Sequence, residues 1–318
     1  MAEFLFIARC LSVSLAVFVV LYVALSLVIP QVWSLLARAF LPVSARRTAR
    51  LLFFLRMLPL LASLTFTLAV TLPSFLLLEP RATDEEVGIA PMLLGACCLL
   101  LIAFGIWRAI LAQRKATQVL NEWLHGASPI QSGIHVPVYQ VDSTAPALTV
   151  AGVCTPRVLI SKSASALLSE CELRTALRHE IAHVRNRDNF KKLLFRVASF
   201  PGMSGLETAW CDAAEMAADD AAVSSVDDAL DLASALIKLS RLVLVQPHLA
   251  VASNLLPSSA ASLNARVQRL FAWNSRPAPA EHSSPVLLPT VLMVLVGLVV
   301  SYGSVLSGMH TATEWLVR

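Results

Sequence analysis

The stretch LSVSLAVFVVLYVALSLVI, residues 11–29, decides the fold class, because it is uncharged and long enough to cross a lipid bilayer. A spanning helix needs roughly 20 apolar residues. Three further uncharged stretches reach this length, at residues 57–78, 89–107 and 286–309. Backbone amides inside lipid must pair within their own segment, so each stretch should form a helix. The sequence therefore predicts a mainly α membrane protein with four transmembrane helices.

The composition of the whole chain agrees with this prediction. The 318 residues are 57% hydrophobic and only 14% charged, with a formal net charge of +4. A soluble domain carries about 25% charged residues. The composition therefore excludes an ordinary soluble globule, and it excludes a disordered chain, which needs low hydrophobicity. The lipid bilayer is an expected partner, whereas the small net charge gives no reason to expect nucleic acid.

Basic residues in the short loops predict how the helices are oriented. The loop 31–50 has no acidic residue and four arginines, which are Arg38, Arg46, Arg47 and Arg50. The loop 79–88 has Arg81 and four acidic residues. Short loops rich in lysine and arginine stay in the cytoplasm, so the first loop should be inside and the second outside. We therefore expect an inner (cytoplasmic) membrane protein whose N-terminus and short tail, residues 310–318, are extracytoplasmic.

The chain divides into three helices within residues 1–110, an insert over 111–285 and a last helix over 286–309. The insert has about 175 residues, enough for one hydrophobic core, and it should lie in the cytoplasm. Its first part is β-like, and Ser169 with Glu172 then predicts a capping box at the start of a helix. The expected strands are 136–141, 147–153 and 157–161; the expected helices are 169–199, 205–223, 227–245 and 263–273; a Pro-rich linker follows at 274–285. An α+β domain is thus expected between the third and fourth spans.

The chemistry is indicated by the HExxH sequence His179-Glu180-Ile181-Ala182-His183. Residues four apart share one face of a helix, so His179 and His183 can bind one zinc ion. Zinc lowers the pKa of a bound water toward about 7. Glu180 can take the proton of that water as it attacks a peptide carbonyl, and can pass it to the leaving amine. The pattern predicts a zinc metallopeptidase with Glu180 as the catalytic residue.

A third ligand is expected from the next predicted helix, where Glu215 and Asp219 share one face. Glu215 is the expected ligand, and Asp219 can accept the spare ring N–H of a zinc-bound histidine. Other carboxylates of the same helix compete for the metal, and they are Glu207, Asp212 and Asp220. Arg187 and Asp188 can form an ion pair or help to orient Glu215. The prediction is one Zn²⁺ ion on His179, His183 and Glu215.

These residues lie in segments that resemble a known family. HEIAHVRNRDN followed by EMAADDAAV is similar to the integral-membrane zinc metallopeptidases of the Bla/Mec signal-transducer type, and so are the four spans, the stretch VCTPRVLISKSASALLSECELRTALRHE and LNARVQRL. The resemblance covers most of residues 1–310. It implies a zincin-like fold, with His179, His183 and Glu215 as zinc ligands, Glu180 as acid/base and Asp219 behind the ligands.

The sequence also departs from that family. Ala218 stands where many relatives have cysteine, and only residues 311–318 follow the last span. We therefore expect no β-lactam-binding sensor domain outside the cell. The resemblance supports peptidase chemistry in signal transduction or regulated proteolysis, and not antibiotic sensing.

Three functions remain open from the sequence. The first is an endopeptidase that cuts itself or a cytoplasmic protein, such as a repressor-like protein. The second is a membrane zinc peptidase of quality control or of prenyl-protein processing, which shares HExxH. The third is a non-catalytic signalling scaffold with a structural zinc site, although such a site has no need of Glu180.

Two expectations concern the substrate. An exposed edge strand beside the zinc helix would let an extended peptide add as a further strand, and residues 157–161 are the expected edge. Tyr139 and His248 are candidate donors to the oxyanion.

Overall fold

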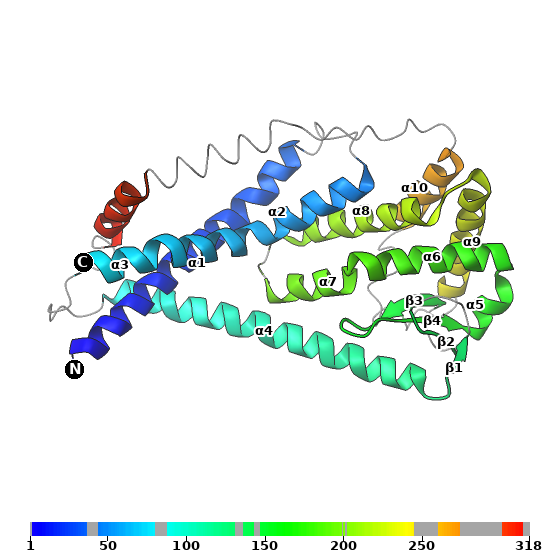
Figure 1. Ribbon diagram of the computed structural model, residues 1–318, viewed down its shortest axis with the longest axis horizontal. Helices are drawn as coiled ribbons and strands as arrows, with labels where there is room; N and C mark the ends of the chain where they lie inside the picture. The colour runs from blue at the N-terminus through cyan, green and yellow to red at the C-terminus, as the bar shows by residue number, and fades with distance from the viewer. Residues whose placement is uncertain are drawn as a thin grey trace.

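The computed structural model describes residues 2–36, 44–79, 88–130, 136–142, 147–198, 200, 202–244, 260–273 and 301–313. This part of the chain is mostly helical and contains one small sheet. The helices α1 (Ala2–Leu36) and α3 (Leu72–Leu78) lie at one end of the molecule, the sheet lies at the other end with shorter helices around it, and α4 (Ile89–Leu124) runs from the first end to the sheet (Figure 1).

Three helices are long and apolar enough to cross a membrane, and they cover Glu3–Leu35, Ala45–Leu78 and Ile89–Leu124. The first is α1 (Ala2–Leu36) and the third is α4 (Ile89–Leu124); the second consists of α2 (Ala45–Phe66), the π-helical η1 (Thr67–Thr71) and α3 (Leu72–Leu78). Each contains one of the first three predicted spans and extends beyond it. The linker 274–285 and most of the predicted fourth span, 286–309, lie outside the described residues, but residues 301–313 are helical.

The break in the second long helix is explained by Pro73. Proline has no N–H to donate to the carbonyl four residues earlier, and the helix widens into η1 just before it. The freed carbonyl of Ala69 accepts a hydrogen bond from the hydroxyl of Tyr302 at 2.6 Å. The hydroxyl of Ser74 donates to the carbonyl of Leu306 at 2.9 Å. The helix of residues 301–313 is therefore joined by two hydrogen bonds to the second long helix, at the π-helical turn η1 and at Ser74.

The rest of the described chain contains four strands and six helices. The strands are β1 (Ser128–Ile130), β2 (Val138–Val141), β3 (Leu148–Ala151) and β4 (Arg157–Ser161). The helices are α5 (Lys162–Leu167), α6 (Glu170–Asn186), α7 (Asp188–Val197), α8 (Ser204–Ala222), α9 (Val226–Leu244) and α10 (Ala260–Phe271). The α+β character predicted for residues 111–285 is present.

The helix predicted over 169–199 is in fact two helices. Arg187 adopts the left-handed conformation with φ 55°, which ends α6 and starts α7. This conformation is unusual for a residue other than glycine. The turn places Asp188 beside the end of α6, where a continuous helix would have carried it away from the face of His183.

The strand predicted at the edge of the sheet is an interior strand. The order is β1-β2-β4-β3, so Arg157–Ser161 pairs on both sides and cannot accept a further strand. The side chains of β4 alternate between two cores, as strand geometry requires. Val158 and Ile160 pack toward α6, and Leu159 packs toward α4. The open edge beside α6 and α7 belongs to β3 instead.

The helix α2 shares one hydrophobic core with α7 and α8. Leu52 and Met57 of α2 pack with Leu206 and Trp210 of α8 and with Phe195 of α7. These side chains are all at most 4% exposed. Burial of this size stabilises by about 1.5–3 kcal/mol for each large side chain. The helices α7 and α8 therefore pack directly against α2.

A close crossing of α4 and α7 depends on Gly105. A Cβ atom at this position would lie 2.2 Å from the backbone oxygen of Val197. Only glycine allows two backbones to approach so closely.

Gly105→Ala is therefore expected to lower the free energy of unfolding by about 1–3 kcal/mol, because the helices must separate to admit the methyl group. Thermal unfolding in detergent micelles measures the change. Gly205→Ala is the matched control: its new methyl group meets nothing within 4 Å, and alanine is the better helix former. Equal midpoints for the two variants would contradict this account of the crossing.

Candidate metal centre

The helix that bears HExxH is held at its N-terminus by the predicted capping box. The Ser169 side chain accepts from the Glu172 amide, and the Glu172 carboxylate accepts from the Ser169 amide at 2.8 Å. The same carboxylate accepts from Ser234 at 2.5 Å and from Lys238 at 2.7 and 2.8 Å. Glu172 thus joins the start of α6 to α9, and so keeps the two histidines in place.

The ionisation of Glu172 should make stability depend on pH. Burial alone would raise the pKa of Glu172, but the hydrogen bonds from Lys238, Ser234 and Ser169 and the charge of Lys238 lower it to about 2. A carboxyl whose folded pKa is depressed stabilises the fold above its unfolded pKa, about 4.5, and loses that contribution as the pH falls toward 2. The shift corresponds to about 3 kcal/mol.

Glu172→Gln is expected to cost up to about 3 kcal/mol at pH 7, and the difference from the wild type should shrink between pH 4.5 and pH 2. Thermal unfolding across this pH range measures both effects. Glu170→Gln is the control, because this carboxylate is exposed and pairs only with Arg174 among the contacts described. A difference that stays constant with pH would count against the proposed ion pair.

His179, His183 and Glu215 converge on one point between α6 and α8. The Nε2 atoms of the two histidines are 3.2 Å apart. The Oε2 of Glu215 is 3.4 Å from the Nε2 of His179, and its Oε1 is 3.5 Å from the Nε2 of His183. The two histidines are buried, and the Glu215 side chain is 11% exposed. The three groups form a set that can hold one metal ion.

The spacing of the three ligand atoms fits zinc. Zinc binds imidazole nitrogen at about 2.0–2.1 Å with tetrahedral geometry, which separates neighbouring ligand atoms by about 3.3 Å. The two Nε2 atoms are 3.2 Å apart, and each lies 3.4–3.5 Å from a different oxygen of Glu215. One ligand atom from each residue gives a set whose members lie within 4.8 Å of one another. Three protein ligands leave the fourth tetrahedral position for water, as in catalytic zinc sites.

Each histidine ring has a carboxylate behind it. The Nδ1 of His179 is 3.0 Å from the Oδ1 of Asp219, and the Nδ1 of His183 is 2.8 Å from the Oδ2 of Asp188. A carboxylate at Nδ1 holds the proton on that nitrogen and turns Nε2 toward the metal. Asp219 therefore lies where the sequence predicts it. Asp188 contacts His183 and not Glu215, and its ion-pair partner is Lys191 at 3.0 Å rather than Arg187.

Arg266 of α10 is a site residue that the sequence did not single out. It is 2% exposed. Its guanidinium donates two hydrogen bonds to Asp219, at 2.8 and 2.7 Å, and lies 3.0 Å from Glu215. It lies 47 residues beyond Asp219 in the chain. The stretch LNARVQRL was noted only for its likeness to a family, and no local pattern reveals which carboxylate an arginine will meet.

The charged side chains around the two histidine rings have a net negative charge when the rings are neutral. Four carboxylates and two basic side chains surround them: Glu180, Asp188, Glu215, Asp219, Lys191 and Arg266. With neutral imidazoles this set has two negative charges in excess, the charge that one divalent cation neutralises. Buried charge is costly unless it is paired.

The same carboxylates shift the pKa values of the groups at the centre. Burial alone would lower the pKa of His183, but the charge of Glu215 and the hydrogen bond with Asp188 raise it to about 10. Burial would likewise raise the pKa of Glu215, yet the charge of His183 and hydrogen bonds with both rings hold it well below its usual range. Metal binding therefore displaces protons from these rings.

Glu180 lies beside the ligand face and is not a ligand. It is half-buried, and its charge acts on His183 and on Arg266. The three groups that could hold a metal ion are His179, His183 and Glu215. The Glu180 carboxylate would therefore be able to accept a proton from a water molecule at the fourth coordination position of a bound metal.

The competing carboxylates of α8 are engaged elsewhere. Glu207 pairs with Arg56 at 3.2 Å, Asp212 accepts from Ser262 at 3.0 Å, and Asp220 pairs with Arg269 at 2.5 Å. None of the three belongs to the metal-binding set found among the described residues.

Tyr139, one of the two possible oxyanion donors, does not lie at the centre. Tyr139 packs in the same core as Leu159 and Leu120, on the α4 side of the sheet, whereas α6 covers the opposite side. Side chains along β2 alternate between the two faces of the sheet, and Tyr139 is on the face that packs against α4. His248 lies outside the described residues.

Comparison with known proteins identifies no relative: no protein-family model matches the chain, and no curated protein matches it.

Proposed function

We propose that this protein is a membrane-embedded zinc endopeptidase, which hydrolyses peptide bonds of a cytoplasmic protein or of itself in signalling or regulated proteolysis. The observation that carries the proposal is the convergence of His179, His183 and Glu215 on one point with separations of 3.2–3.5 Å, with Glu180 beside it. On the motifs given above, we group it with the integral-membrane metallopeptidases of the Bla/Mec type.

The residues of the chain divide the chemistry among them. Zinc held by His179, His183 and Glu215 would supply a Lewis acid and a coordinated water with a pKa near about 7. Glu180 accepts the proton of the attacking water and then delivers it to the leaving amine. Asp219 and Asp188 hold the two rings in the orientation that the metal requires.

The proposal includes a topology. Four transmembrane helices carry a zincin-like domain on the cytoplasmic side, and both termini lie outside. Three long apolar helices support it, together with the arginines of the loop 31–50.

Metal removal tests the proposal. The full chain, purified in detergent micelles, is incubated with a cytoplasmic extract, and new protein N-termini are identified, including those of the chain itself. We expect new N-termini with the zinc-loaded protein, none after chelation, and recovery when one equivalent of zinc is added. The same cleavages in the chelated sample would refute a zinc peptidase.

Metal analysis separates catalysis from a structural site. We expect one zinc per chain in the wild type, and none in His183→Ala. His125→Ala is the control, because His125 is an exposed residue at the end of α4. Bound zinc without cleavage of any protein would favour the signalling scaffold instead.

A further inference from the structure

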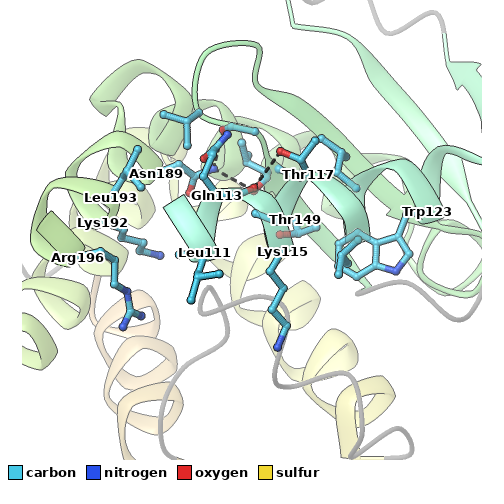
Figure 2. A pocket seen from close by; sticks show the side chains of 18 of the residues that line it. Leu111, Gln113, Lys115, Thr117, Trp123, Thr149, Asn189, Lys192, Leu193 and Arg196 are labelled. Atoms are coloured by element: carbon cyan, nitrogen blue, oxygen red, sulfur yellow. Dashed lines mark hydrogen bonds between the residues drawn. The ribbon is translucent and has the colours of Figure 1, made fainter. Parts of the chain in front are cut away.

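A cavity of about 450 Å³ lies between α4, α7 and the edge strand β3. Its lining comes from residues 108–123 of α4, residues 149–153 at β3, and residues 189–196 of α7. Figure 2 shows Lys192 and Arg196 of α7 on one wall, with Leu111 and Lys115 of α4 beside them. The metal ligands and Glu180 do not line it, so the cavity is distinct from the metal centre.

All charged residues that line the cavity are basic. Arg108 and Lys115 come from α4, and Lys192 and Arg196 come from α7. Residues four or seven apart share one face of a helix. Each helix therefore contributes two basic residues to the lining, and the Arg108 guanidinium also lies over the Phe104 ring at 5.6 Å. Four positive charges with no acidic residue in the lining are complementary to an anion, and more than one negative charge can be accommodated.

The remaining walls of the cavity are largely apolar. Leu111, Leu120 and Trp123 of α4 and Leu193 of α7 contribute to them. A small inorganic anion has no apolar part that could contact this surface. A ligand that joins a negative group to hydrocarbon satisfies both parts of the lining.

The cavity begins where α4 leaves the predicted membrane span. Arg108 directly follows Trp107, which is 56% exposed, as expected for an aromatic residue at the membrane surface. The close crossing of α4 and α7 at Gly105 and Val197 lies next to the cavity, three residues before Arg108 on α4 and one residue after Arg196 on α7. Lys115 lies about 10 Å beyond Arg108 along the helix. These two cations therefore follow directly on the predicted membrane span.

We propose that this cavity binds the headgroup of an anionic phospholipid. Its phosphate groups lie among Arg108, Lys115, Lys192 and Arg196, and its glycerol and first acyl carbons lie against the apolar wall. Basic pockets on the cytoplasmic side of membrane helices bind such headgroups.

An acidic peptide added to β3 is the competing occupant, and the open edge of β3 disfavours it. Ser161 donates to the carbonyl of Ala147 across the β3–β4 pair. Because hydrogen bonds alternate along an antiparallel pair, the carbonyls of Val150 and Gly152 point to the open edge. The side-chain amide of Asn189 already donates to both, at 3.2 and 3.0 Å. An added strand would have to displace it.

Lipid retention tests the proposal and does not depend on zinc. The full chain is reconstituted in bilayer nanodiscs of phosphatidylcholine with one fifth phosphatidylglycerol or cardiolipin, extracted in mild detergent, and the retained lipids are counted by native mass spectrometry. We expect anionic lipid to be retained in preference to phosphatidylcholine. The double variant Lys192→Gln/Arg196→Gln should bind it about thirtyfold more weakly, since each basic residue near an anionic surface contributes about a factor of five.

Two further variants keep the test decisive. Arg174→Gln/Arg178→Gln removes the same charge from the exposed face of α6, outside the cavity, and should retain lipid like the wild type. Lys115→Gln changes one exposed side chain, which has little effect on folding, and should weaken binding about fivefold.

Equal retention by the cavity and control variants would overturn the proposal. So would full competition by millimolar glycerol phosphate, which would make the ligand a soluble phosphate ester. Binding of an acidic peptide in place of lipid would equally overturn it.

Discussion

Replacing Glu180 by glutamine is expected to slow peptide hydrolysis about 10²–10⁴-fold while one zinc ion stays bound to each chain. Glutamine has nearly the same shape but cannot accept a proton from the attacking water. Glu180 is not among the residues proposed to hold the metal, which are His179, His183 and Glu215, so the metal content should not change. The appearance of new N-termini, counted against bound zinc in the same sample, measures both quantities.

The control for this variant is Glu170→Gln, at the exposed start of the same helix. It removes the same charge from α6 and should leave both cleavage and zinc unchanged. If Glu180→Gln and Glu170→Gln process proteins at equal rates, Glu180 is not the acid/base and the proposed mechanism is wrong.

Arg266→Met is expected to lower the free energy of unfolding by about 3–5 kcal/mol, because it leaves the buried Asp219 carboxylate without its guanidinium. Asp219 is 1% exposed, and the charge and hydrogen bonds of Arg266 hold its pKa down to about 2 against the effect of burial. The loss of stability should be larger after chelation than with zinc bound, because bound zinc neutralises the charge of Glu215. Thermal unfolding of the loaded and chelated protein measures both values.

Two comparisons make the result specific to the buried pair. Arg269→Met removes an arginine from the same helix, but its pair with Asp220 is partly exposed and should be worth only about 0–1 kcal/mol. The double variant Arg266→Met/Asp219→Asn removes both buried charges and should recover part of the stability. Equal losses in Arg266→Met and Arg269→Met would show that the buried contact has no special weight.

Features that depend on neighbouring residues could be predicted from the sequence. The start of α6 follows from Ser169 and Glu172, which are three residues apart. The shared face of His179 and His183 follows from one helical turn. The three long apolar helices follow from the length of uncharged stretches.

Features that depend on distant residues could not be predicted. The turn at Arg187 has no local signal, since the left-handed conformation is rare outside glycine, and Asp188 was therefore not paired with His183. The interior place of β4 depends on which strands lie beside it, and the short strands look alike in sequence.

The sequence by itself determined the apolar helices and the shared face of His179 and His183, because helix periodicity and hydrophobic length act over a few residues. Only the tertiary structure decided that Arg266 pairs with the carboxylates of Glu215 and Asp219, and that α4 and α7 enclose a basic cavity. Both results arise from the packing of helices that are far apart in the chain. The energy of such contacts comes from burying charge and apolar surface together, which no local pattern records.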